Sequence, residues 1–213
     1  MSSPRVPVIS AMYFGPVELY RFLAGHKEVV VDVGEHYERQ TYRTRTSIIG
    51  PNGKQDLVVQ IARRSGEKMP MRSVGISYVE SWPQQHIHAL RSAYGKTPWF
   101  IHFIDDLEEL LLQPHERLVD LDIASMQLCL KWLAIKIELV ISDEYVESPI
   151  TEDLRSSFQP KKPLPSSITP VEPYQQVFAD RHGFVQRLGI IDLLCNCGPQ
   201  SMNYLLRLIG LEL

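Results

Sequence analysis

Residues 6–31, VPVISAMYFGPVELYRFLAGHKEVVV, decide the fold class that we expect for this chain. The apolar run over residues 6–14 is typical of a buried strand, and Gly15-Pro16 ends it. Proline suits the first position of a helix, and the residues after it predict a helix that ends at Gly25. Residues 29–31 then predict a short second strand. Strand, helix and strand in this order predict a βαβ unit with two parallel strands.

The rest of the chain predicts a hairpin and several helices around that unit. Residues 41–49 and 56–62 flank Gly50-Pro51-Asn52-Gly53, whose proline and glycines favour a tight turn. Apolar spacing predicts further elements: strands over 74–77 and 137–141, and helices over 81–94, from Pro98, over 117–135, over 190–194 and from Tyr204. We expect a mixed α/β fold, a single domain over residues 1–213. Its central sheet would contain the parallel pair and the hairpin, with the 117–135 helix packed on it.

The composition fits a globular protein and excludes several classes of function. Of the 213 residues, 44% are hydrophobic and 22% are charged, and the net charge of −3 offers no basic excess for nucleic-acid phosphates. No apolar run approaches the roughly 18 residues of a membrane span. The first residues lack the apolar stretch of a secretion signal, and three cysteines favour a reducing compartment. We therefore expect a cytoplasmic protein that binds no nucleic acid.

Residues 147–173 differ from the rest of the chain in composition. Five prolines fall between Pro160 and Pro173, beside Lys161 and Lys162. Such a stretch predicts an extended arm rather than a regular element. It is either a plain linker or an arm that packs across a functional site, because long irregular stretches within compact domains are often functional.

Short motifs follow one another in order along the chain. They are Ser10-Ala11-Met12-Tyr13-Phe14-Gly15-Pro16, Gln40-Thr41-Tyr42-Arg43-Thr44-Arg45, Trp82 with His86, Ser92-Ala93-Tyr94, Asp105-Asp106-Leu107-Glu108, Asp153-Leu154-Arg155, Pro160-Lys161-Lys162, Pro173-Tyr174-Gln175-Gln176-Val177-Phe178, His182-Gly183-Phe184, Ile190-Ile191-Asp192-Leu193-Leu194, Asn196 and Gly198-Pro199. Together these motifs resemble those of the WbqC-like protein family. The resemblance runs from about residue 6 to residue 204.

The resemblance implies a pathway more than a reaction. The family takes its name from a protein of O-antigen gene clusters, and its members are commonly encoded beside surface-polysaccharide and amino-sugar genes. This chain resembles the shorter branch. Longer members begin with His-Gln-Pro where this chain has Ser10-Ala11-Met12, and they carry a second glycine-rich segment that this chain lacks. Roles that depend on those elements do not carry over.

Arg43 and Arg45 are the first candidate ligand-binding residues. They lie two apart on a predicted strand, so their side chains would leave the same face. Paired guanidiniums favour an anion between them, and arginine matches phosphate or carboxylate bidentately. The alternative is two solvated arginines that pair with Glu38 or Asp56. The resemblance covers both arginines and favours a small anionic or sugar ligand.

His86, Asp32 and Glu35 are the candidate catalytic residues. His86 falls on the inward side of its predicted helix, where it is either a hydrogen-bonded core residue or a general base. The Trp-x-x-x-His pattern of the family falls on this histidine. Asp32 and Glu35 follow the second predicted strand, where residues of parallel sheets face a ligand crevice. They would orient a sugar hydroxyl or the imidazole, or they are solvated loop acids.

Five further residues are candidate substrate contacts. Tyr13 and Tyr42 would line the crevice, or they are core aromatics. Lys161, Tyr174 and Gln176 belong to the arm and its exit, and they would add a cation, a stacking face and an amide if the arm crosses the crevice.

No metal or cofactor is expected. Cys195 and Cys197 cannot complete a zinc site, and the remaining Cys129 lies on a buried helix pattern. Phosphate-loop, dinucleotide-binding and nucleophile-elbow signatures are missing from the sequence. We expect a role in surface-polysaccharide biosynthesis, with acyl or related group transfer to an amino sugar as one hypothesis. The second is a non-catalytic protein that binds a sugar nucleotide or a pathway enzyme. Convergence of His86, Asp32 or Glu35, and the arginine pair on one open pocket would favour the enzyme. A buried His86 apart from them would favour the binding protein.

Overall fold

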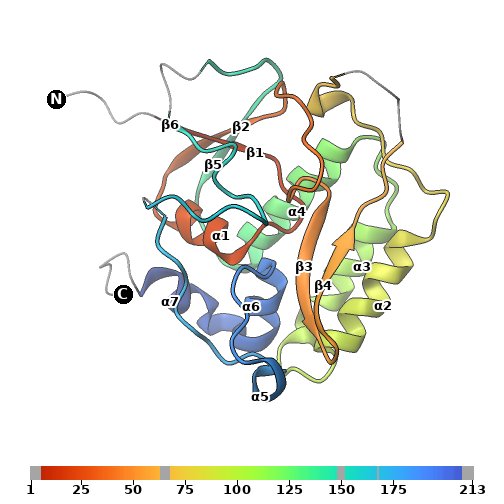
Figure 1. Cartoon of the computed structure of the whole chain (residues 1–213), viewed down its shortest axis with the longest axis vertical. Helices are drawn as coiled ribbons and strands as arrows, with labels where there is room; N and C mark the ends of the chain where they lie inside the picture. The colour runs from red at the N-terminus through yellow and green to blue at the C-terminus, as the bar shows by residue number, and fades with distance from the viewer. Residues whose placement is uncertain (1–5, 63–67, 148–151, 167, 208–213) are drawn as a thin grey trace.

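The computed structural model describes residues 6–62, 68–147, 152–166 and 168–207 (Figure 1). Its elements follow in chain order: β1 (Pro7–Ser10), α1 (Val17–Ala24), β2 (Glu28–Asp32), β3 (Arg45–Gly50), β4 (Gly53–Val58), the 3₁₀ turn η1 (Met71–Ser73), α2 (Trp82–Tyr94), η2 (Phe100–His102), α3 (Ile104–Leu112), α4 (Leu118–Trp132), β5 (Glu138–Ser142), β6 (Glu152–Asp153), α5 (Ala179–His182), α6 (Ile190–Cys197), η4 (Gly198–Gln200) and α7 (Ser201–Leu206). The mixed α/β class is confirmed.

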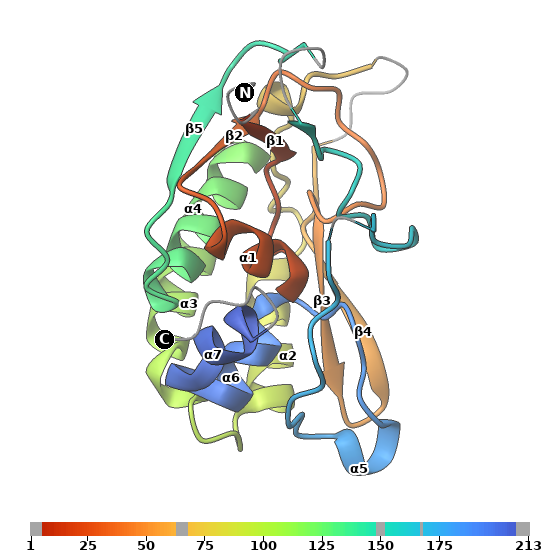
Figure 2. The same cartoon turned by 90° about the vertical axis from the view of Figure 1, so that its left-hand side faces the viewer.

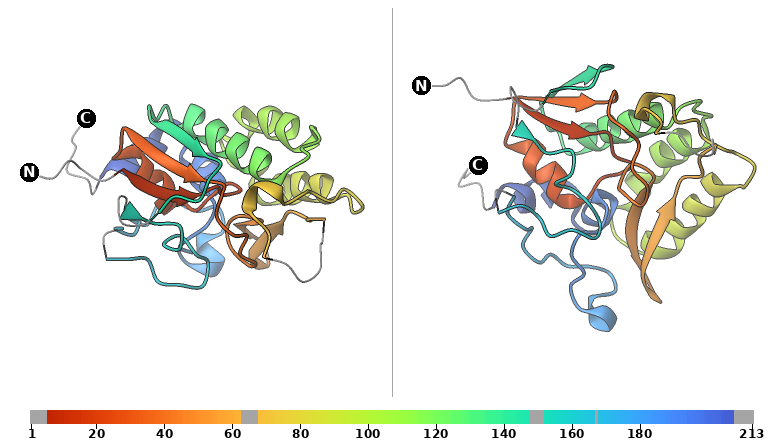
Figure 3. Two further views of the ribbon diagram at one scale, coloured as in Figure 1. Left: turned by 90° about the horizontal axis from the view of Figure 1, so that it is seen from above. Right: turned by 45° about the horizontal axis from the view of Figure 1, so that its top comes forward.

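The central sheet has four parallel strands in the order β5-β2-β1-β6. Figure 3 shows these strands side by side, with β5 and β6 at the two edges. Ser10 of β1 lies opposite Asp32 of β2, and Asp32 lies opposite Ser142 of β5. The predicted parallel βαβ unit is therefore confirmed, and the carboxyl ends of its strands are level with one another.

The hairpin of β3 and β4 is antiparallel, as predicted, but it forms a sheet of its own. Our placement of the hairpin in the central sheet was wrong. The free edge of β1 pairs instead with β6, a two-residue strand within the segment that we expected to be irregular. The hairpin packs against α2 and α6, on the opposite side of the molecule from β5 (Figure 2).

Two strands are shorter than the sequence pattern predicts: β1 ends earlier, and β3 begins later. β1 ends at Ser10, and the following loop crosses α4, where the Ser125 hydroxyl accepts a hydrogen bond from the Phe14 backbone N–H at 3.1 Å. Phe14 has a φ of 41°, which a straight strand does not allow. β3 begins at Arg45, because residues 41–44 form a turn instead.

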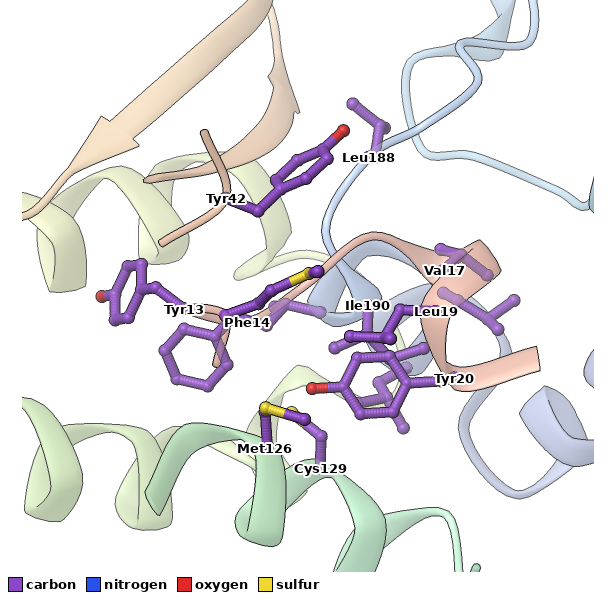
Figure 4. Packing of buried hydrophobic residues seen from close by; sticks show 14 of the residues in the cluster. Tyr13, Phe14, Val17, Leu19, Tyr20, Tyr42, Met126, Cys129, Leu188 and Ile190 are labelled. Carbon is purple, nitrogen blue, oxygen red and sulfur yellow. The ribbon is translucent and has the colours of Figure 1, made fainter. Parts of the chain in front are cut away.

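The main core lies between α4, α1, α6 and the loop after β1. Figure 4 shows Phe14 and Tyr20 over Met126 and Cys129 of α4, with Ile190 of α6 beside them. Each of these side chains is buried. A residue that points from α4 toward the sheet therefore lies in a nonpolar environment, and any charge there is costly.

The proline-rich arm lies against the turn that precedes β3. The Gln159 amide donates a hydrogen bond to Glu38 at 3.0 Å, and Lys161 donates one to the Gln40 side chain at 3.0 Å. The Arg187 guanidinium donates to the backbone carbonyls of Gln159, at 2.6 Å, and of Lys162. These contacts hold the arm beside the residues that we expected to bind the ligand.

Candidate functional site at the carboxyl end of the parallel sheet

Polar residues meet at the carboxyl ends of the parallel strands. Ser10 ends β1 and Asp32 ends β2, and the two lie in register. Successive strands run from β1 to β2 and β5 on one side, whereas β6 returns to the other side of β1. Open parallel sheets bind ligands outside the carboxyl ends of their strands at such a switch point. We call five residues here the carboxyl-end cluster: Ser10, Asp32, Glu35, Arg43 and Arg155.

Arg43 and Glu35 form a buried ion pair in this cluster. The guanidinium donates to both Glu35 oxygens, from Nε at 2.9 Å and from Nη2 at 2.7 Å. It also donates to the Ser10 hydroxyl at 2.8 Å, the Thr41 hydroxyl at 3.2 Å and Glu38 at 3.5 Å. Burial raises the pKa of Glu35, and Arg43 acts in the opposite direction. Each nitrogen of the Arg43 guanidinium is therefore engaged within the protein.

Asp32 and Arg155 form a second ion pair that joins β2 to the segment after β6. Arg155 Nη1 donates to Asp32 at 2.5 Å, and both side chains are buried. Asp32 also accepts backbone N–H bonds from Gly34 at 2.9 Å, Glu35 at 3.0 Å and Val146 at 3.1 Å. Asp32 thus closes the loop after its own strand and anchors Arg155 at the switch point.

Arg155 is a site residue that our sequence analysis missed. Hydrogen bonds with Asp153 are the main cause of its raised pKa, and its guanidinium lies 4.2 Å from the centre of the Tyr145 ring. The Asp153-Leu154-Arg155 motif was the available signal. Its role was hidden because β6 was not recognised as a strand. Tyr145 and Glu38 are exposed or half exposed and form the solvent-facing rim of the cluster.

Arg45 does not join Arg43 on one strand face. Arg43 lies in the turn and is 3% exposed, whereas Arg45 starts β3 and pairs with Asp56 of β4 at 3.1 Å. The expectation of two guanidiniums side by side on one strand was wrong, because β3 begins at Arg45, four residues later than predicted, and Arg43 lies before it. The Arg45 side chain is 20% exposed, and its Nε is buried without a hydrogen-bond partner among the described residues.

His86 lies in the core and contacts Tyr13. The Tyr13 hydroxyl is 2.9 Å from His86 Nδ1, both side chains are buried, and the Trp82 ring packs edge-on against the imidazole. Burial lowers the pKa of His86 to about 4, and a hydrogen bond with the Val58 backbone acts in the opposite direction. Burial likewise raises the pKa of Tyr13 well above its ordinary value. Both groups are therefore neutral near pH 7.

The structure keeps His86 apart from the acids that we expected to orient it. Within the described ranges, no hydrogen bond joins His86 to Asp32 or Glu35, which pair with Arg155 and Arg43 instead. The group that positions the imidazole is Tyr13. Local sequence patterns could not identify Tyr13 as this partner, because Tyr13 lies in the loop after β1 and His86 lies on α2.

Asp122 of α4 is a second residue that sequence analysis missed. It is fully buried, and neither carboxylate oxygen has a hydrogen-bond partner among the residues that the structure describes. Burial raises its pKa well above the ordinary value, while the charge of Arg43 acts in the opposite direction. Asp122 also raises the pKa of Tyr13, so its charge state affects Tyr13 and is itself affected by Arg43.

Tyr174 and Gln176 belong to a separate buried network around Asp192. Asp192 accepts hydrogen bonds from Tyr174 at 2.6 Å, Tyr94 at 2.9 Å, Gln176 at 3.0 Å and Asn196 at 3.4 Å. Burial raises the pKa of Asp192, and these hydrogen bonds act in the opposite direction. The network joins α2, the exit of the arm and α6, and Tyr174 presents no stacking face to solvent.

Tyr42 belongs to the turn before β3, and Lys161 lies beside the residues that lead into it. Tyr42 is buried and donates to the Arg187 carbonyl at 3.4 Å, and burial raises its pKa to about 12. Lys161 is exposed and contacts Gln40. Lys161 is thus a cation at the rim, whereas Tyr42 supports the turn from beneath.

The three cysteines are free and buried, and burial raises the pKa of Cys129 and of Cys197 to about 12. In the part of the chain that the structure describes, no group of three or more histidine, cysteine or acidic residues could hold a metal ion. The same residues include no helix long and apolar enough to cross a membrane.

The WbqC-like protein family model matches residues 12–160, and the chain belongs to this family. The match includes the loop after β1, Asp32, Glu35, Arg43, Arg45, His86 and Arg155. It ends before the tail motifs that begin at Pro173. No curated protein and no solved structure matches the chain. The family name is consistent with a role in O-antigen-related biosynthesis.

Proposed function

We propose that this protein acts in O-antigen-related surface-polysaccharide biosynthesis by binding a sugar nucleotide. The observation that carries the proposal is the carboxyl-end cluster at the switch point between β1 and β6, within the residues that match the family. Parallel sheets bind small ligands at this place. Buried polar groups and a solvent-exposed polar rim together suit a ligand that has both hydroxyl groups and phosphates.

The roles of the individual residues follow from their hydrogen bonds. Arg43 and Arg155 are engaged with buried carboxylates, so they fix the shape of the site rather than supply free donors. The Arg45 guanidinium is partly exposed and pairs with Asp56 alone among the described residues, and Lys161 is an exposed cation on the arm. We assign the phosphates of the ligand to these two residues. Exposed oxygens of Glu38 at the rim would accept hydrogen bonds from sugar hydroxyls.

The position of His86 favours a binding protein over an enzyme that uses this histidine at the cluster. The imidazole is 4% exposed and is held by Tyr13, and it has no contact with Asp32 or Glu35. A general base must come within hydrogen-bond reach of the proton that it removes. Binding of a sugar nucleotide at the strand ends needs no such approach.

The Tyr13–His86 pair keeps a second candidate function open, which is acyl transfer to an amino sugar. Its imidazole stays neutral near pH 7 and could accept a proton from an attacking amine, with Tyr13 as the group that orients it. This role requires a substrate path to His86. Release of free thiol from an acyl thioester in the presence of an amino-sugar nucleotide tests it. Loss of turnover in His86→Gln without loss of ligand binding would favour the transferase.

The experiment for the primary proposal is a thermal-shift panel of nucleoside-diphosphate sugars, followed by calorimetric titration of the best ligand. Arg45→Gln should weaken binding, whereas Arg91→Gln is the matched control. Arg91 also belongs to an exposed ion pair, with Glu108 at 2.6 Å, but it lies on α2 away from the cluster. Equal affinity of wild type and Arg45→Gln would refute the assignment of the phosphates.

A further inference from the structure

A groove lies between the tip of the hairpin and the exposed side of α2. Its cavity volume is about 430 Å³, and it is lined by Gly50, Pro51, Gln55, Gln84, Gln85, His88, Ala89, Ser92 and Ala93. Figures 1 and 2 show the hairpin tip beside α5, at the opposite end of the molecule from the parallel sheet. The groove is therefore distinct from the carboxyl-end cluster.

The polar side chains of this groove are uncommitted. Gln55, Gln84, Gln85, His88 and Ser92 make no side-chain hydrogen bond to any residue within the described ranges, and all five are exposed. Each glutamine amide offers both a donor and an acceptor, and the serine hydroxyl offers both as well. The groove thus presents many hydrogen-bonding groups with no internal partner.

The lining contains no aspartate, glutamate, lysine or arginine. A phosphate or carboxylate would find no fixed opposite charge there, although such a charge is the main source of affinity for these groups. Neutral hydroxyl and amide groups match amide side chains without any charge. The volume falls within the roughly 300–1,000 Å³ range of small-molecule sites.

The rim of the groove is held in place by a distant segment. His182 of α5 contacts the Pro51 carbonyl at 3.2 Å, and the lining residues Gly50 and Ala93 are buried. Ser92-Ala93 and His182-Gly183 are both motifs that the sequence analysis singled out, and the carboxyl-end cluster uses neither. A turn fixed by such a contact keeps the groove formed without a ligand.

We propose that this groove binds a neutral saccharide, the uncharged glycan portion of a substrate or product. The inference rests on the proposed role in surface-polysaccharide biosynthesis, and it places saccharide recognition at a second site. The cluster would hold the nucleotide-linked sugar, and the groove would hold neutral sugar units through the amides of Gln84 and Gln85 and the Ser92 hydroxyl.

Saturation-transfer NMR and calorimetric titration test this site with N-acetylglucosamine and maltose as probes. The double variant Gln84→Ala with Ser92→Ala should weaken saccharide binding by roughly five- to a hundredfold, the loss of two neutral hydrogen bonds. The control is Lys96→Ala, an exposed residue just beyond α2 and outside the lining. Both substitutions are at the surface, and melting curves confirm that the fold persists.

Two outcomes overturn the inference: neither probe binds wild-type protein, or the double variant binds as wild type does. The proposed function fails separately, in the titrations of nucleoside-diphosphate sugars with Arg45→Gln. A chain that binds sugar nucleotides through Arg45 but no neutral saccharide in the groove would refute only the second site. The reverse pattern would refute only the first.

Discussion

The Arg43 guanidinium donates hydrogen bonds to both oxygens of the Glu35 carboxylate, at 2.9 and 2.7 Å, and both side chains are buried. This relationship fixes the loop after β2 against the turn before β3. This ion pair also occupies the guanidinium that we expected, from the sequence, to bind an anionic ligand. Arg45 and Lys161, which are more exposed than Arg43, are the cations to which we assign the phosphates of the proposed ligand.

Arg43→Met should destabilise the protein strongly, because it leaves the Glu35 carboxylate buried without its partner. Breaking a buried pair in this way costs about 3–5 kcal/mol. Chemical denaturation measures the loss. Arg45→Met is the matched control, since its pair with Asp56 is partly exposed and contributes at most about 1 kcal/mol. Similar losses in the two variants would contradict the buried pair.

His86 should make stability depend on pH. Its pKa is about 4 in the folded chain and 6.5 in a model peptide. Between these values the unfolded chain binds more protons, so the free energy of unfolding falls as the pH drops from about 6.5 to about 4. The lost stability is on the order of 3 kcal/mol at about 1.4 kcal/mol per pKa unit. Denaturation curves of His86→Gln should lack this part of the pH dependence; an unchanged dependence would place the titration elsewhere.

Asp122→Asn should stabilise the protein, and more so as the pH rises. The raised pKa keeps Asp122 protonated in the folded chain while it ionises in the unfolded chain, so folding loses stability as the pH rises above about 4. Asparagine is never charged and removes this loss. We expect a measurable gain in the free energy of unfolding at neutral pH and little change near pH 3. Destabilisation at neutral pH would mean that Asp122 has an ionic partner.

Tyr94→Phe and Tyr174→Phe should each destabilise the protein. Each removes one of the hydrogen bonds to the fully buried Asp192, and a hydrogen bond of this kind contributes about 0.5–1.5 kcal/mol. Tyr78→Phe is the control, because its hydroxyl lies at the surface and bonds only backbone groups of His115. Equal melting temperatures for all three variants would argue against a structural role of the network.

Local sequence patterns predicted the elements that carry their own signals. The proline and glycines around Gly50 predicted the hairpin, and the apolar runs predicted the parallel pair of β1 and β2. β6 has two residues, too few for any periodic signal. It pairs with β1 at the position that we had expected the hairpin to take in the central sheet. The turn before β3 depends on the contacts of Arg43 with distant residues, which no local pattern contains.

The candidate site was predicted only in part for the same reason. Asp32 and Glu35 lie at or just after the end of a recognisable strand, so their place at the carboxyl end of the parallel sheet could be predicted. Their partners Arg43 and Arg155 come from other elements, and pairing between elements depends on the whole fold. The acid of α4, Asp122, shares a helix face with apolar residues, and nothing in its spacing marks it as unpartnered.

The most direct test of the account is calorimetric titration of a nucleoside-diphosphate sugar, chosen by the thermal-shift panel, into wild type, Arg45→Gln and Arg91→Gln. The account predicts that wild type and Arg91→Gln bind equally and that Arg45→Gln binds roughly tenfold or more weakly, the loss of about one charge-assisted hydrogen bond. No binding to wild type, or equal binding by all three proteins, would contradict it.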